Sequence, residues 1–252
     1  MEQRFSGGGI VDFVDFDLEK QTVRELNQFL HKEFDGAAEV RIHNPDGAHH
    51  IACGMNVPAK IDIMGNAGYF VAGMNKHAEV TVHGSVGWSV AENIMSGTVR
   101  VNGYASECAG ASGHGGLLVV EKDASSRCGI SMKGNDIVVG GSVGHFSAFM
   151  AQAGRLVVCG DAGDGLGDSL YEAVIYVRGE IKGLGADARE EAMGEGDLTS
   201  LSELLGRAGF EYRPEEFKRI ASARTLYHWN AEDGGSHEHG RGGTRRKQFV
   251  RP

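Results

Sequence analysis

A glycine-rich turn is the first feature of this chain whose residue types and spacing could support chemistry. Residues 136–145 read DIVVGGSVGH, an alternating apolar run that leads into the turn, as in a strand entering a phosphate-binding loop. A dinucleotide-binding loop should open a helix and be followed by an acidic residue about 20 positions further on. Here more glycine turns follow instead, the next of them at residues 160–167. The pattern therefore favours architectural glycines over a nucleotide site.

Carboxylates and histidines are the candidate metal ligands. Asp161, Asp164 and Asp168 could collect a calcium ion, but their spacing matches neither an EF-hand nor the nonapeptide of calcium β-rolls. The pairs His49–His50 and His237–His239 have no third ligand nearby in the sequence. We therefore expect solvated turn carboxylates and no metal site.

The candidate nucleophiles and acid pairs are equally isolated. No G-x-S-x-G elbow is present, and nothing in the sequence pairs Glu92 with Glu107 as acid and base. Iron–sulfur and zinc sites normally show closely spaced cysteines. The four cysteines, none in a C-x-x-C pair, are Cys53, Cys108, Cys128 and Cys159. The sequence thus predicts no catalytic, cofactor-binding or metal-binding residue in this chain.

Composition narrows the class of protein. The chain has 252 residues with 39 glycines, and its net charge of -9 argues against a general affinity for nucleic acid. No apolar run is long enough to span a membrane, and the acidic N-terminus lacks the apolar core of a secretory signal. We expect a cytoplasmic protein with reduced thiols.

A 19-residue repeat explains the glycines. Rows that begin at Lys60 and recur every 19 residues, as far as Val174, align six columns without a gap. The second and fourth columns are aliphatic, and the thirteenth is always alanine or glycine. Apart from Lys122, the sixth column is glycine throughout: Gly65, Gly84, Gly103, Gly141, Gly160 and Gly179.

Each row is a strand–corner–strand unit that can bury its apolar face only by stacking on its neighbours. The alternation of β-branched residues predicts short strands, the sixth column suits a turn with positive φ, and the small thirteenth column suggests a tight corner. The repeat therefore predicts an all-β fold, a right-handed parallel β-helix over residues 39–190. Residues 39–59 form an irregular first coil.

Helices are expected on both flanks of the rod. A capping box from Thr22 to Glu25 predicts an amphipathic helix that ends near residue 33. Asp197 is expected to cap a second helix that Gly209 stops, and Pro214 to begin a third. The predicted organisation is an N-terminal arm and helix (1–38), the β-helix (39–190), and C-terminal helices with a flexible basic tail (191–252).

One outward-facing column could carry contacts. The third column begins polar and turns apolar in the C-terminal half, where it forms a stripe of four residues: Val119, Val138, Val157 and Tyr176. Large exposed apolar patches usually mark contacts. Either the helix with the stripe Leu201, Leu204, Leu205 and Ala208 folds back over it, or a partner docks there.

The rows, with second halves such as Ala72-Gly-Met74, resemble the GXGXG repeat domain of the glutamate synthase large subunit. That domain recurs in a component of formylmethanofuran dehydrogenase. The segments Thr22–Leu30 and Ser222–Asn230 look like the ends of stand-alone GXGXG subunits encoded with glutamate synthase-like partners. Among these the chain most resembles the β-helix subunit of N-methylglutamate synthase (methylamine–glutamate N-methyltransferase).

The resemblance implies a division of labour. In that family an amidotransferase-type subunit handles the amide, and a second subunit binds FMN and an iron–sulfur cluster. The GXGXG part is the scaffold between them, so this chain would bind no cofactor itself. The rivals are a formylmethanofuran dehydrogenase component, in a complex with molybdenum or tungsten, and a self-contained β-helix enzyme, which would normally be secreted.

Overall fold

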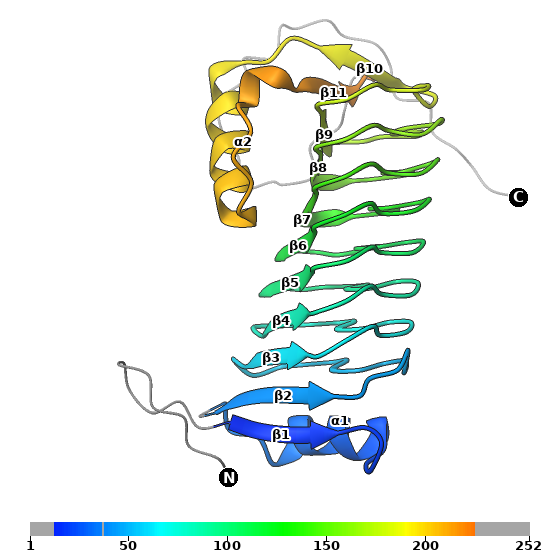
Figure 1. Ribbon diagram of the computed structural model, residues 1–252. Helices are drawn as coiled ribbons and strands as arrows, with labels where there is room; N and C mark the ends of the chain where they lie inside the picture. The colour runs from blue at the N-terminus through cyan, green and yellow to red at the C-terminus, as the bar shows by residue number, and fades with distance from the viewer. Residues whose placement is uncertain (1–12, 37, 225–252) are drawn as a thin grey trace, which may run out of the picture.

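A single 11-stranded sheet runs the length of the molecule (Figure 1). The computed structural model describes residues 13–36 and 38–224. Strands β1 to β9 stack in chain order and in parallel, and β11 and β10 follow in antiparallel pairing. The strands are β1 (Phe13–Asp17), β2 (Glu39–His43), β3 (Lys60–Ile63), β4 (Glu79–Val82), β5 (Thr98–Val101), β6 (Leu117–Val120), β7 (Lys133–Val139), β8 (Ala153–Val158), β9 (Val174–Val177), β10 (Ala188–Glu191) and β11 (Lys218–Ser222).

The predicted right-handed β-helix is confirmed, and so is its register. From β3 to β9 the residues of the first four columns pair with those a full row later, as Lys60 does with Glu79 and Arg155 with Val174. The register shifts only at the start of β7, where Lys133 pairs with Ala153. The first coil is longer, because Glu39 pairs with Lys60, 21 positions on. A second ladder of isolated parallel bridges follows the eighth column from Ala67 to Ile181.

The core fills the inside of the coils. Every residue in the second and fourth columns is buried, from Ile61 and Ile63 in β3 to Ile175 and Val177 in β9. Each such aliphatic side chain contributes roughly 1.5–3 kcal/mol on burial. Stacking therefore stabilises a unit that could not fold alone.

The prediction that the sixth-column glycines adopt positive φ is wrong for five of the six. Only Gly65 has such a φ, at 146°. At Gly84 an added Cβ would lie 2.6 Å from the carbonyl carbon of Gly65, and at Gly103 it would lie 2.7 Å from that of Gly84. At these two positions glycine is needed because the backbones of successive coils touch, whereas Lys122 shows that the column can hold a side chain where the coil-to-coil bond is longer, 3.3 Å to Gly103 O.

Residues with a positive, left-handed φ are found instead at the corner formed by the thirteenth column. Ala72, Ala91 and Ala148 of the thirteenth column have φ values of 52°, 53° and 55°. Left-handed φ is unfavourable for residues with a Cβ, by roughly 1–2 kcal/mol each. Hydrogen bonds between coils offset this: the Ala72 N–H donates to Ile51 O at 2.9 Å, and the Ala91 N–H to Val71 O at 2.9 Å. The predicted tight corner is thus confirmed.

The N-terminal flank matches its capping signal. Helix α1 (Val23–Lys32) begins after Thr22, whose Oγ1 accepts from the Glu25 N–H at 3.2 Å, while Glu25 Oε2 accepts from the Thr22 N–H at 2.7 Å. Its buried Leu26 and Leu30 join the core of the rod. Strand β1, which the sequence did not predict, precedes this helix and pairs with β2.

The C-terminal flank corrects two expectations. Helix α2 (Glu195–Ala208) is capped by Gly194, and Asp197 lies in its first turn, where Oδ2 accepts from the Gly194 N–H at 3.0 Å. It ends at Gly209, with φ 79°, as predicted.

Pro214 does not begin a third α-helix. It begins a single 3-10 turn, η1 (Pro214–Glu216), after which β11 pairs with β9. Phe217 packs with α2 whereas Ile220 enters the coil core, so the two side chains lie on opposite faces. A helix would have put residues three apart on one face, and pairing with the open end of the sheet overrode that local pattern.

We expect a Gly84→Ala substitution to destabilise the protein by about 1–3 kcal/mol, because the new Cβ must push two coil backbones apart. Gly206→Ala in α2 is the matched control: its Cβ would meet nothing within 4 Å. Helix propensity predicts that this change stabilises by about 0.5–1 kcal/mol. Urea unfolding of both variants checks the pair, and equal stability of the two would contradict the close-approach explanation.

Candidate functional site

The apolar stripe predicted on the third column is covered by the chain's own helix. Val119, Val138 and Val157 are fully buried and Tyr176 nearly so. Figure 1 shows α2 standing alongside the C-terminal half of the sheet. Leu201, Leu204, Leu205, Ala208 and Phe217 complete this second core. Of the two alternatives, the helix folds back over the stripe, and the stripe is not an open surface for a partner.

Polar contacts fix α2 at both ends. Tyr176 Oη donates to Asp197 Oδ1 at 2.7 Å, and Arg219 Nε donates to the same oxygen at 2.9 Å. Burial, and then the bond to Asp197, raise the pKa of Tyr176 well above its usual range. At the other end, Arg100 Nη2 donates to Ala208 O at 3.0 Å, where the negative end of the helix dipole favours a cation.

The aspartates considered as calcium ligands, which were expected to be solvated turn carboxylates, connect coils. Asp161 Oδ1 accepts from the Glu180 N–H at 2.8 Å, and Asp168 Oδ2 accepts from the Ala186 N–H at 3.2 Å. Asp164 contributes its backbone carbonyl to the next coil below. In the part of the chain that the structure describes, no group of three His, Cys, Asp or Glu side chains could hold a metal ion.

The histidine pair belongs to a stack of rings at the corner of the rod. His49 stacks on Tyr69 with ring centroids 4.3 Å apart, and Tyr69 stacks on Trp88 at 5.3 Å. His50 stacks on Phe70 at 5.4 Å. Row alignment could have found this ladder, because its rings occupy equivalent positions of the first three coils. The second pair, His237 and His239, lies outside the described residues.

The four thiols are poor nucleophiles. Burial raises the pKa of both Cys128 and Cys159 to about 12. Burial also raises the pKa of Cys53 and Cys108, and the Cys53 thiol donates to Phe70 O at 2.6 Å. Since the thiolate is the reactive form, none of the four is activated.

Of the two glutamates considered as an acid pair, Glu107 lies 4.0 Å from the guanidinium of Arg127. In the part of the chain that the structure describes, no hydrogen bond joins the Glu107 and Glu92 side chains. The arrangement of a general acid with a general base is therefore not found in the described structure at these two positions.

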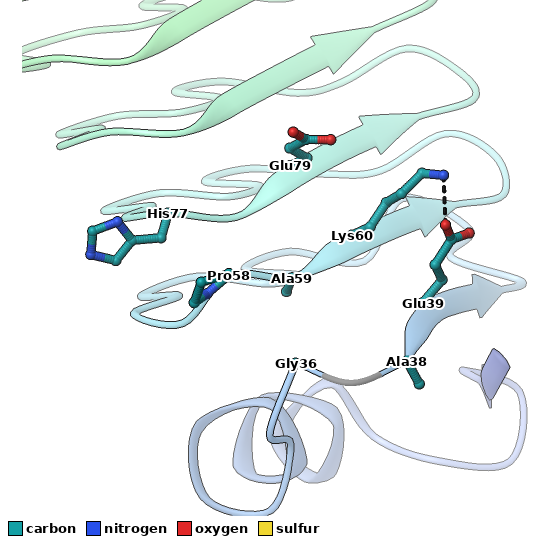
Figure 2. Close-up of a pocket in the computed structure, with 8 residues that line it drawn as sticks. All are labelled: Gly36, Ala38, Glu39, Pro58, Ala59, Lys60, His77 and Glu79. Carbon is teal, nitrogen blue, oxygen red and sulfur yellow. Dashed lines mark hydrogen bonds and ion pairs between the residues drawn. The ribbon is translucent and has the colours of Figure 1, made fainter. Parts of the chain in front are cut away.

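A hollow of about 390 Å³, with a lining that is part polar and part apolar, lies beside the first coils (Figure 2). Lys60 Nζ reaches Glu39 Oε1 at 2.7 Å, while His77 points away from this pair. The bond to Glu39 raises the pKa of Lys60, so the amine stays protonated at neutral pH. The charged side chains that line the hollow are those of Glu39, Lys60 and Glu79.

A second hollow, of about 310 Å³, lies at the corner beside the ring ladder. Its lining is mostly apolar, and Phe70 and Met74 are 38% and 56% exposed. The residues around it are His50, Cys53, Phe70, Gly73, Met74, Glu92 and Asn93. Neither the ladder nor this hollow was predicted from the sequence.

The whole chain was compared with known proteins. Protein GlxC of Rhizobium meliloti (strain 1021) is 53% identical over 220 residues, which cover 86% of this chain and 96% of that protein. The chain belongs to the GlxC family. No family model and no solved structure matches this GlxC-family chain. Among its described residues, no helix has the length and apolar character needed to cross a membrane.

A lysine beneath α2 should detach the helix from the rod. We expect Val138→Lys to destabilise by about 3–5 kcal/mol, because the ammonium would be buried without a partner. Thr81→Lys is the matched control, since Thr81 lies in the same column on β4 but α2 does not reach it. Thermal unfolding and limited proteolysis of α2 measure the effect. The packing explanation fails if both variants keep wild-type stability and protease resistance.

Proposed function

We propose that this chain is the non-catalytic scaffold subunit of a glutamate synthase-like complex, most closely an N-methylglutamate synthase. The reaction of that complex joins glutamate and methylamine to give N-methylglutamate and ammonia. The chain would hold an amidotransferase-type subunit against a subunit that carries FMN and an iron–sulfur cluster. It would contribute no catalytic residue and no cofactor ligand.

The observation that carries the proposal is how the polar groups are used. The side chains that could have formed a site instead join one coil to the next, as Asp161 and Asp168 do. Others, such as Asp197 and Arg219, hold α2. A rod held together in this way is stiff along its axis, because each coil is bonded to the next by backbone ladders on two sides. Stiffness suits a spacer that fixes the distance between two active sites.

The open part of the sheet face supports the same role. Below α2 the third column presents Asp62 and Thr81, and Asp62 Oδ1 lies 2.7 Å from His83 Nε2. A polar, regularly spaced face of this kind suits a contact that forms between subunits folded separately, since such interfaces are about as polar as ordinary protein surface.

Co-purification tests the proposal. The full chain, tagged and expressed with the proteins encoded beside it, should recover an amidotransferase-type subunit and a flavin-absorbing subunit in fixed stoichiometry. Methylamine-dependent formation of N-methylglutamate should require all components. The isolated chain is the control and should show neither turnover nor flavin absorbance.

Two results would overturn it. One is stoichiometric flavin or iron retained by the isolated, folded chain, which would make it more than a scaffold. The other is a recovered complex that contains molybdenum or tungsten and lacks flavin, as expected of the formylmethanofuran dehydrogenase type.

A further inference from the structure

The corner of the first coils carries an apolar surface that nothing in the described structure covers. Tyr69, Phe70, Met74 and Trp88 are 40%, 38%, 56% and 51% exposed. They surround or adjoin the 310 Å³ hollow above Cys53. Large side chains exposed together in this way usually mark a contact site.

The edge of this hollow is acidic. Glu92 lines it and has no basic partner at ion-pair distance among the described residues. Glu107 lies one coil further on, where its backbone carbonyl accepts from the Ser89 N–H at 2.9 Å and its carboxylate lies 4.0 Å from the guanidinium of Arg127. The occupant should therefore pair an apolar side chain with positive charge. A second acidic rod, from a chain with net charge -9, would be repelled here.

The described chain ends on the same corner. A ladder of backbone hydrogen bonds climbs from the hollow, where the Met74 N–H donates to Glu92 O, to the last coil, where the Ser169 N–H donates to Ala186 O. The next residue, Asp187, accepts from the Ala223 N–H at 2.6 Å and pairs with Arg224. The C-terminal residues thus leave the rod about five coil steps from the hollow, roughly 24 Å along the axis.

We propose that the C-terminal segment 241–252 docks on this hollow. Its sequence, RGGTRRKQFVRP, offers an apolar pair, Phe249–Val250, between basic residues. The apolar pair would fill the hollow, and Arg245, Arg246 and Lys247 would face Glu92 and Glu107. The residues from 225 to 248 can span up to about 80 Å when extended, so the segment has ample length to reach.

The rate at which the Cys53 thiol reacts measures whether the hollow is covered, because Cys53 lines it. We expect a small neutral thiol reagent to modify Cys53 about three- to tenfold faster once residues 241–252 are deleted, or once Arg245, Arg246 and Lys247 are all changed to Glu. Glu92→Lys should have a similar effect alone. When Glu92→Lys is combined with the three tail glutamates, the opposite charges face each other again and Cys53 should again be modified slowly. Cys159, buried beneath α2, is the control for general loosening of the fold.

The isolated full chain is used, so the result does not depend on any partner of the proposed complex. Equal Cys53 rates in the full and shortened chains would overturn the proposal. So would protection that persists in the shortened chain and grows with protein concentration, because a second copy would then cover the hollow. The proposal requires that Cys53 is modified slowly in the chain that carries both Glu92→Lys and the three tail glutamates. This rate should not depend on the protein concentration.

Discussion

The direct contact between backbones at the sixth column is the constraint on which the rest of the rod depends. The Gly103 N–H donates to Gly84 O at 2.9 Å, the Gly160 N–H to Gly141 O at 2.8 Å, and the Gly179 N–H to Gly160 O at 3.0 Å. These bonds form only if successive coils bring the same position to the same place. Even Lys122, the one side chain in this column, keeps the bond, since its N–H donates to Gly103 O at 3.3 Å. A row with one residue more or fewer would break this series of bonds, so the contact holds the row length constant.

The same constraint decides what the polar residues do. At the seventh column, next to the glycines, side-chain oxygens of one coil accept backbone N–H groups of the next. Asn66 Oδ1 accepts from the Ser85 N–H, Asp123 Oδ1 from the Ser142 N–H, and Ser142 Oγ from the Asp161 N–H. Buried or half-buried N–H groups need such partners. Asp161, a candidate metal ligand in the sequence, continues this series, because its Oδ1 accepts from the Glu180 N–H.

What could be predicted from the sequence follows from the range of each interaction. The row length and the inward columns were predictable because the same local pattern recurs in every row, and α1 because its capping box spans only four residues. Strands β1 and β11 were missed because each depends on pairing with a distant strand, as Ile220 does with Ile175. The hollow was missed because it depends on which side chains of three coils meet at a corner. The ring ladder could have been found from the rows, because Tyr69 and Trp88 occupy the same column.

A single residue divides the outer face of the sheet into two parts with different uses. Arg100 on β5 donates to the last turn of α2 and pairs with Glu121 at 2.6 Å. Beyond it, from Val119 on, the column is apolar and lies under the helix; before it, Thr81 and Asp62 lie outside the helix. The change in side-chain character follows from where α2 ends, since apolar residues further down would be left exposed. The covered part therefore stabilises the fold, and only the uncovered part can meet another protein without displacing a piece of this one.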